Sequence, residues 1–240
     1  MGNIFRTDRF LRNGLLVIGL AVFFGVFTTS DTPAQGPLGQ ILNRMDAYNK
    51  NLQSLRADIT MVKTDSVLDL SDTTWGNTTY LPKTTKPKRV MYVRIDWTKP
   101  LQEQIVVIGE DYKLYRPTLN VAYEGKTSKA QNNAKAGGAL AFVSMSKDQL
   151  KANYSVVYIG EETISGGTRT WHLQLTPKVA TTYKLADVWV NADGLPQQSK
   201  VTENNNDSTT ILLTNIQWNI KINTGIFVLP YKKGTTVNKV

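Results

Sequence analysis

From Ala57 onward, apolar residues recur at every second position, and this alternation runs through most of the chain. Successive side chains of a β-strand point to opposite faces, so such segments are predicted to be strands with one apolar face. The pattern covers residues 91–97, 154–159, 171–176 and 216–222. In the first of these segments the apolar positions are Met91, Val93, Ile95 and Trp97.

Turn signals separate the alternating segments. They are Gly109-Glu110-Asp111, Ser165-Gly166-Gly167, Asp193-Gly194 and the polar run 204–207. Glycine, asparagine and aspartate favour the tight turns that join neighbouring antiparallel strands. The sequence therefore predicts an antiparallel meander.

Two segments show a helical rather than a strand pattern. Residues 38–55 carry apolar side chains at three- and four-residue steps after Gly36-Pro37, which marks a helix start. Residues 139–145 form a short apolar piece that is compatible with a helix. Ser146 and Gln149 have the spacing of a capping box for a further helical turn. Residues 69–88 and 127–136 are polar and are predicted to be loops.

These elements predict an α+β fold, in which a strongly curved antiparallel sheet has an apolar face covered by helices. Helices that cover the face fully would make an ordinary core, whereas a loose cover would leave a cavity. The pattern alone leaves both alternatives open. Residues 35–240 are expected to form a single domain, with neither a repeat nor a linker in them.

The first 34 residues have the composition of a cleaved signal peptide. Arg6, Arg9 and Arg12 precede an uncharged apolar run over residues 14–27, and small residues follow near Ala34. The run is shorter than the roughly 20 residues of a membrane-spanning helix, although an uncleaved anchor is the alternative. We therefore expect export to the periplasm. Ser30, Ala34 and Gln35 are all compatible with the cut.

Composition argues against most catalytic classes. The chain has no cysteine and one histidine, His172, which excludes the usual nitrogen and sulfur metal sites, and without cysteine neither a disulfide nor a lipid anchor is expected. No nucleophile elbow or phosphate-binding glycine motif occurs. His172 is expected on the outside of a strand. We expect no cofactor, no metal and no enzymatic activity.

The net charge of +9 falls to about +8 without residues 1–34. In an exported protein such a charge either maintains solubility or attracts a partner. That partner would be anionic lipid headgroups or an acidic protein rather than nucleic acid.

A basic residue also occupies an unusual position, because counting back by twos from Met91 places Arg89 on the apolar face. Its guanidinium then needs hydrogen-bond acceptors from a helix end or loop, or else reaches the rim beside Lys86 and Lys88.

Several motifs occur in a family-like order over residues 38–240. They are Lys88-Arg89, Lys99-Pro100, Gln104-Ile105-Val106-Val107, Leu114-Tyr115-Arg116-Pro117, Leu175-Thr176-Pro177-Lys178, Asp193-Gly194, Phe227, Pro230 and Gly234-Thr235-Thr236-Val237. In this order they resemble the outer-membrane lipoprotein carrier family of the LolA type. The chain departs from the family at Val90, where the family has proline, at the longer 69–88 segment, and at the charged Arg94.

The resemblance implies an open, incomplete β-barrel with helices forming a lid over an apolar cavity. It implies that the ligand-binding cavity is lined by Met91, Val93, Ile95 and Trp97 and by the lid residues Leu140, Phe142, Val143 and Met145. It also implies that Arg89 holds the lid shut when the cavity is empty. It further implies a monomeric periplasmic carrier that takes lipoprotein acyl chains from an inner-membrane ABC transporter to an outer-membrane acceptor. A carrier of free lipid or glycolipid, or a sensor of mislocalised lipoproteins, is the alternative.

Overall fold

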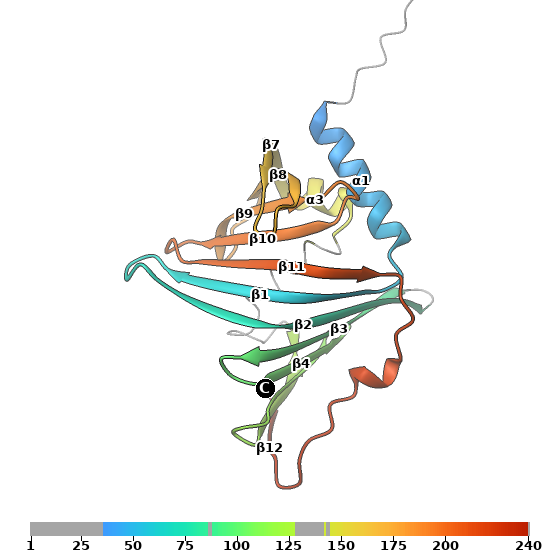
Figure 1. Ribbon diagram of the computed structural model, residues 1–240, viewed down its shortest axis with the longest axis vertical. Coiled ribbons are helices and arrows are strands. Elements are labelled where there is room, and N and C mark those ends of the chain that lie inside the picture. Colours follow the sequence, from blue (N-terminus) through green and yellow to red (C-terminus); the bar gives the residue numbers. More distant parts are fainter. Residues whose placement is uncertain (1–35, 86–87, 128–141, 143–144, 240) are drawn as a thin grey trace, which may run out of the picture. The chain divides into compact units, whose positions relative to one another are not determined.

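The computed structural model of the protein describes residues 36–85, 88–127, 142 and 145–239, without the side chains of residues 84, 85, 88 and 89 (Figure 1). The signal peptide and cleavage predicted for residues 1–34 lie outside the described residues. The described residues belong to one compact unit, residues 35–240.

Among the described residues, strands far outnumber helices. The elements are α1 (Pro37–Asn51), β1 (Leu55–Asp65), β2 (Leu70–Thr85), β3 (Lys88–Lys99), β4 (Glu103–Ile108), β5 (Asp111–Arg116), β6 (Val121–Lys126), α3 (Lys147–Asn153), β7 (Tyr154–Thr163), β8 (Arg169–Pro177), β9 (Tyr183–Val190), β10 (Pro196–Glu203), β11 (Ser208–Trp218), the 3₁₀ turn η2 (Thr224–Phe227) and β12 (Thr236–Lys239).

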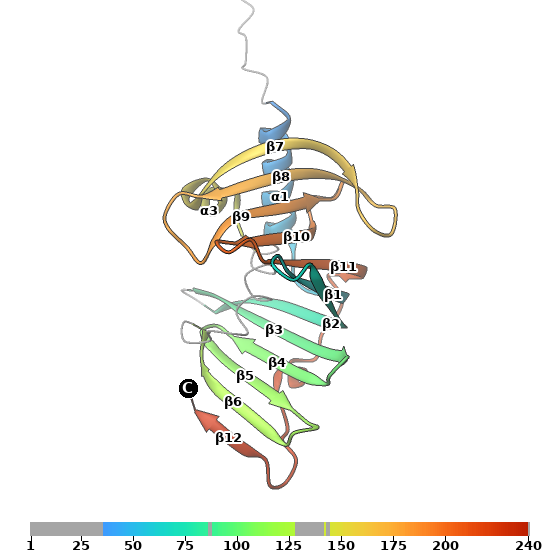
Figure 2. The ribbon, with the colours of Figure 1, turned by 90° about the vertical axis from the view of Figure 1, so that its left-hand side faces the viewer.

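The described strands form one 12-stranded sheet in the order β12-β6-β5-β4-β3-β2-β1-β11-β10-β9-β8-β7. Two meanders, β1 to β6 and β7 to β11, are joined where β1 pairs with β11. Every pairing is antiparallel except that of β12 with β6. The sheet is curved and does not close, since β12 and β7 are its two edges (Figure 2). The predicted open, curved antiparallel sheet with helices is confirmed.

The first helix begins as predicted, with Gly36 as its N-cap and Pro37 in its first turn. It ends at Asn51 rather than at Leu55, which already belongs to β1. Asn219 explains this early end, because its side chain accepts a hydrogen bond from the amide of Gln53 at 2.7 Å and donates one to the carbonyl of Asn51 at 3.1 Å. These bonds satisfy backbone groups that a helix end leaves free.

The same asparagine corrects the predicted strand over residues 216–222. Strand β11 ends at Trp218, and Asn219 adopts a left-handed backbone with φ 55°. Asparagine tolerates this conformation better than most residues, and it turns the chain away from the sheet. Ile222 therefore packs on the opposite face of the sheet from the one that its alternation with Ile216 indicates.

The predicted loop over residues 69–88 is wrong, because residues 70–85 form the 16-residue strand β2. Its polar, threonine-rich sequence lacks the apolar alternation of the other strands, but threonine favours extended structure. Residues 70–80 pair with β1 on one side, and β2 pairs with β3 along the other. Pro82 lies beyond the residues paired with β1, where hydrogen bonds are needed on one side only.

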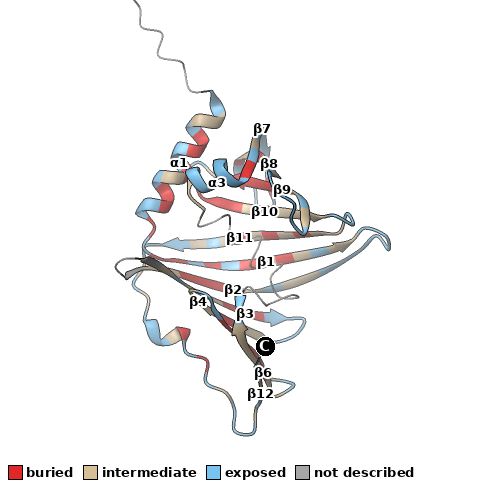
Figure 3. Ribbon diagram, turned by 180° about the vertical axis from the view of Figure 1, so that it is seen from behind, coloured by how far each residue is buried: buried red, intermediate tan, exposed pale blue. Residues whose placement is uncertain are grey.

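We define the inner face of the sheet as the face that packs against α1, and the outer face as the opposite one. Ile41, Leu42 and Met45 of α1 are almost completely buried against the inner face of β8 and β9. Tyr48 and Leu52 pack against the inner face of β1, β2 and β11. Buried residues accordingly follow one side of α1 (Figure 3).

The outer face is covered over part of its area by the segment between β11 and β12. Phe227, Leu229 and Tyr231 of this segment pack on Val106 and Tyr115. Arg94 of β3 donates a hydrogen bond to the carbonyl of Ile226, which fixes η2 to the sheet. The chain then returns as β12 beside β6.

The capping box predicted at Ser146 is confirmed, since its side chain accepts from the amide of Gln149 and the Gln149 side chain accepts from the amide of Ser146. Within the described part of the chain, no helix is both long enough and apolar enough to span a membrane.

Candidate functional site

The inner face of the sheet is the main apolar surface of the protein. The strand register places Ile59 of β1, Leu213 of β11 and Ile95 of β3 on this face together with their cross-strand neighbours. Apolar side chains continue across the whole width of the sheet, from β6 near one edge to β7 at the other, and they form two clusters. Burial of so much apolar surface under few helices is typical of a carrier cavity or of a core.

All four residues predicted to line the cavity from β3 lie on this inner face, because their partners in β2 are the inner-face residues of that strand. Ile95 and Trp97 are buried, with 4% and 5% of their surface exposed. Val93 is half-buried against the same cluster. Met91 is 41% exposed. The strand thus runs from a closed end at Trp97 toward an open end at Met91, and contact with a ligand stays a prediction.

Two of the four predicted lid residues can be placed. Phe142 is buried, lies 5.9 Å from the ring of Tyr154, and shares a cluster with Leu42 and Leu150. Met145 is partly buried against the same cluster. Leu140 and Val143 lie outside the described residues.

Arg89 pairs through its backbone with Thr84 of β2. Its side chain lies outside the described part of the protein, so the gating role stays a prediction.

Several polar groups on the inner face are paired with one another. Arg116 forms an ion pair with Glu103 at 2.7 Å and lies over the ring of Tyr123. The hydroxyls of Tyr154 and Tyr183 share a hydrogen bond of 2.6 Å.

The hydroxyl of Tyr48 differs from these groups, because it is buried without a hydrogen-bond partner among the described residues. Burial, with a smaller contribution from Asp193, raises the pKa of Tyr48 to about 12. No sequence pattern signals this group, because Tyr48 fits the apolar stripe of α1.

His172 lies on the outer face, as its position in the alternating strand predicts. Its ring is more enclosed than a surface histidine, with 12% of the side chain exposed, and it stacks on Trp189. One ring nitrogen lies 2.8 Å from Glu162 and the other 2.8 Å from Asp187. Hydrogen bonds from Trp189 and from His172 hold the pKa of Glu162 below its usual value. The described residues contain no cluster of three metal-ligating side chains.

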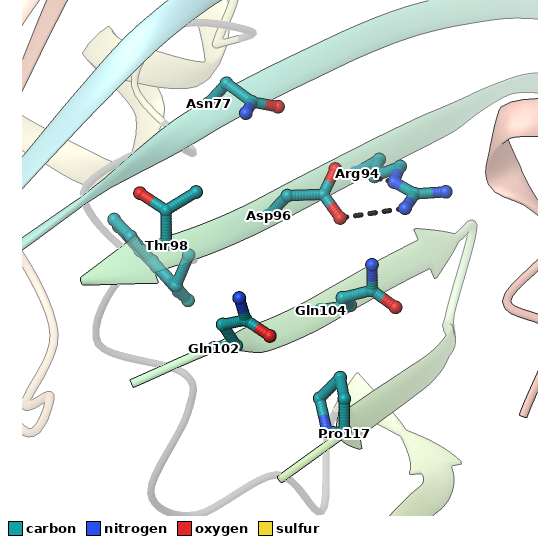
Figure 4. Close-up of a pocket in the computed structure, with 8 residues that line it drawn as sticks. Asn77, Arg94, Asp96, Thr98, Gln102, Gln104 and Pro117 are labelled. Carbon is teal, nitrogen blue, oxygen red and sulfur yellow. Dashed lines mark hydrogen bonds and ion pairs between the residues drawn. The ribbon is translucent and has the colours of Figure 1, made fainter. Parts of the chain in front are cut away.

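A polar groove of about 320 Å³ lies on the outer face of β2, β3 and β4 (Figure 4). Sequence reasoning missed it, because its residues come from three strands and meet only through the register. The register sets Asn77, Asp96 and Gln104 side by side across these strands. The full lining is Asn77, Arg94, Asp96, Thr98, Gln102, Gln104 and Pro117, together with Trp97, whose side chain packs in the inner-face cluster.

The chain resembles several solved structures at low sequence identity. The crystal structure of MucB superposes with a TM-score of 0.51 at 12% identity, over 80% of this chain and 62% of MucB, so the chain spans less than two thirds of that protein. A DUF1329 family protein from Desulfovibrio piger gives a TM-score of 0.45 at 15% identity, over 79% and 95% of the two chains. A LolA superfamily protein from Nitrosomonas europaea gives 0.40 at 14% identity, over 79% and 96%.

No curated protein matches the sequence. The model of the family described as outer membrane lipoprotein carrier protein LolA, by contrast, matches residues 84–230, which is more than half of the chain. This range contains β3, which carries the predicted cavity residues, and ends just beyond η2. The chain therefore belongs to the outer membrane lipoprotein carrier protein LolA family.

Proposed function

We propose that this protein is a periplasmic carrier that binds the acyl chains of lipoproteins on the inner face of its sheet and shuttles them from the inner to the outer membrane. The apolar inner face under α1, in a chain of the LolA family, is the observation that carries the proposal. Binding rather than catalysis is the proposed activity.

The chemistry of the inner face suits an acyl chain. Its clusters are built from aliphatic and aromatic side chains. The polar groups of Glu103 and Arg116, and of Tyr154 and Tyr183, are paired with each other, so an acyl chain that covers them leaves none of these groups without a partner. Each buried methylene contributes about 0.8 kcal/mol, so ten contribute about 8 kcal/mol before the costs of binding. That gross value corresponds to roughly micromolar affinity.

The open end of β3 offers an entry point for such a chain. Exposure rises along the inner face from the buried Trp97 to the exposed Met91. A ligand that enters at Met91 would pass Val93 before it reaches the closed end. Handover then needs no large energy input, because the acceptor has only to bind the acyl chain more tightly than this face does.

Titration of the purified protein with palmitate that carries a fluorescent group tests the proposal. We expect binding at micromolar concentrations and a loss of at least about tenfold in Met91→Glu, because a carboxylate on the acyl path must be desolvated. Val157→Glu is the matched control, since Val157 is 52% exposed on the outer face. Equal affinities of the two variants would contradict the proposed site.

Mass spectrometry of material that copurifies from the periplasm identifies the cargo. Acylated protein supports the lipoprotein carrier. Free lipid or glycolipid without acylated protein would contradict it and favour the alternative carrier. Crosslinking in cells would then test contact with an inner-membrane ABC transporter and an outer-membrane acceptor.

A further inference from the structure

The polar groove on the outer face has a chemistry unlike that of the inner face. Asn77, Asp96 and Gln104 are direct neighbours across β2, β3 and β4, where opposed side chains are about 5 Å apart. Thr98 and Gln102 extend the row toward one end of the strands (Figure 4). All these side chains project from the same face of a sheet whose backbone groups are already paired in the ladder.

The ionised groups in the groove neutralise each other. Arg94 forms a two-pronged ion pair with Asp96, with its Nε 2.7 Å and its Nη2 2.8 Å from the two carboxylate oxygens. A further nitrogen of Arg94 donates to the carbonyl of Ile226. With its charge and its donors engaged in this way, Arg94 is a poor partner for a phosphate or carboxylate ligand. The groove therefore favours a neutral ligand.

Three amide side chains in the groove have no hydrogen-bond partner among the described residues: Asn77, Gln102 and Gln104. Each amide offers a carbonyl acceptor and an NH₂ donor. The carboxylate oxygens of Asp96 retain lone pairs beyond those used by Arg94. A ligand that both donates and accepts at several neighbouring points satisfies such a set, and hydroxyl groups do this.

An exposed aromatic residue, Trp75, lies on the same strand as Asn77. Trp75 is 47% exposed and lies two residues before Asn77 in β2, on the same face. At about 3.4 Å per residue, their side chains are about 7 Å apart along the strand. The carbonyl of Trp75 accepts a hydrogen bond from Thr98, which ties this part of β2 to the groove. The ring offers an apolar plane next to the polar row.

We propose that this groove is a second binding site, and that it takes a neutral saccharide. Hydroxyl groups of a sugar would bond to Gln104, Asn77 and Asp96, and the C–H face of a sugar ring would stack on Trp75. A peptide is less suited, because peptide strands pair with a sheet edge, whereas the groove lies on a sheet face. The site is separate from the inner face, so it does not depend on the carrier proposal.

Saturation-transfer NMR of the purified protein with maltotetraose, cellotetraose and acetylated chitotetraose tests this site. We expect transfer to at least one of them, and a titration then gives its dissociation constant. Gln104→Leu and Trp75→Ala should each weaken binding about tenfold, which corresponds to about 1.4 kcal/mol. Gln217→Leu, an exposed glutamine on β11 outside the groove, should stay within about twofold of wild type.

The proposal is overturned if none of the three saccharides binds, or if Gln104→Leu binds as tightly as wild type. It is also overturned if only anionic sugars or peptides bind. Fluorescent palmitate serves as the internal reference, because Gln104→Leu should bind it normally. Loss of saccharide binding with intact palmitate binding thus tests this groove alone, and failure of palmitate binding in the wild type would count only against the carrier.

Discussion

Replacement of Gly194 by alanine is the substitution whose effect on stability the structure predicts most sharply. It lies in the turn between β9 and β10 with φ +92°, a conformation that side chains disfavour. A Cβ at this position would lie 2.4 Å from the carbonyl oxygen and 2.5 Å from the carbonyl carbon of Arg44 in α1. Because both atoms belong to helix backbone, the strain can be relieved only by moving α1 or the turn.

The expected cost of Gly194→Ala has two parts. The left-handed conformation costs about 1–2 kcal/mol, and overpacking against backbone costs about 1–3 kcal/mol. A total of about 3 kcal/mol would lower the Tm by roughly 6–12 °C in a domain of this size. Arg44 also donates a hydrogen bond to the carbonyl of Ala192 at 3.1 Å, and a shift of the turn would weaken this bond.

Gly166→Ala is the matched control for Gly194→Ala. Gly166 has φ +90°, but nothing lies within 4 Å of the position that a Cβ would take there. Gly166→Ala should therefore lower the free energy of unfolding only by the cost of the left-handed conformation. Urea unfolding of both variants measures the difference. Equal losses of stability would refute the tight contact between the β9–β10 turn and α1.

Three further predictions test the packing and the polar groups. Leu42 of α1 is 1% exposed, and Leu42→Ala should lower the free energy of unfolding in urea by about 2–5 kcal/mol. Leu119 is 64% exposed, and Leu119→Ala should lower it by less than about 0.5 kcal/mol. Similar losses in the two variants would contradict the packing of α1. Tyr48→Phe removes an unpaired hydroxyl and should leave the free energy of unfolding unchanged or higher. Tyr231→Phe removes a hydrogen bond to Glu124 and should lower that free energy by about 1–2 kcal/mol. A clear loss of stability in Tyr48→Phe would reveal a partner for the Tyr48 hydroxyl. Because the folded pKa of Glu162 is lowered, its carboxylate stabilises the fold above the ordinary glutamate pKa of about 4.3, and this stabilisation is lost as pH falls through the folded value. Glu162→Gln should therefore flatten the decline in the free energy of unfolding below about pH 5. An unaltered decline would refute the role of Glu162.

The inner face could be predicted from the sequence because period-two alternation fixes which side chains share a face. Met91 through Trp97 needed only this local rule, as did the Asn204–Asp207 turn and the capping box at Ser146. The helix covering the face also followed from local periodicity, apart from its end, which Asn219 determines from a distant part of the chain.

Other features depended on long-range pairing and could not be predicted. Strand β2 is polar and is held in place by its pairing with β1 and β3. The groove requires the register that aligns Asn77, Asp96 and Gln104, residues that no local pattern connects. The unpaired hydroxyl of Tyr48 is visible only once its surroundings are known.

Photocrosslinking with a fatty acid that carries a diazirine on its acyl chain tests the central claim most directly. Peptide mass spectrometry would locate the adducts. The proposed carrier predicts adducts on inner-face residues such as Val93, Val107 and Tyr123, and competition by unlabelled palmitate should remove them. Adducts confined to outer-face residues such as Val157 and Ile159, or no adducts that compete, would contradict binding of acyl chains on the inner face.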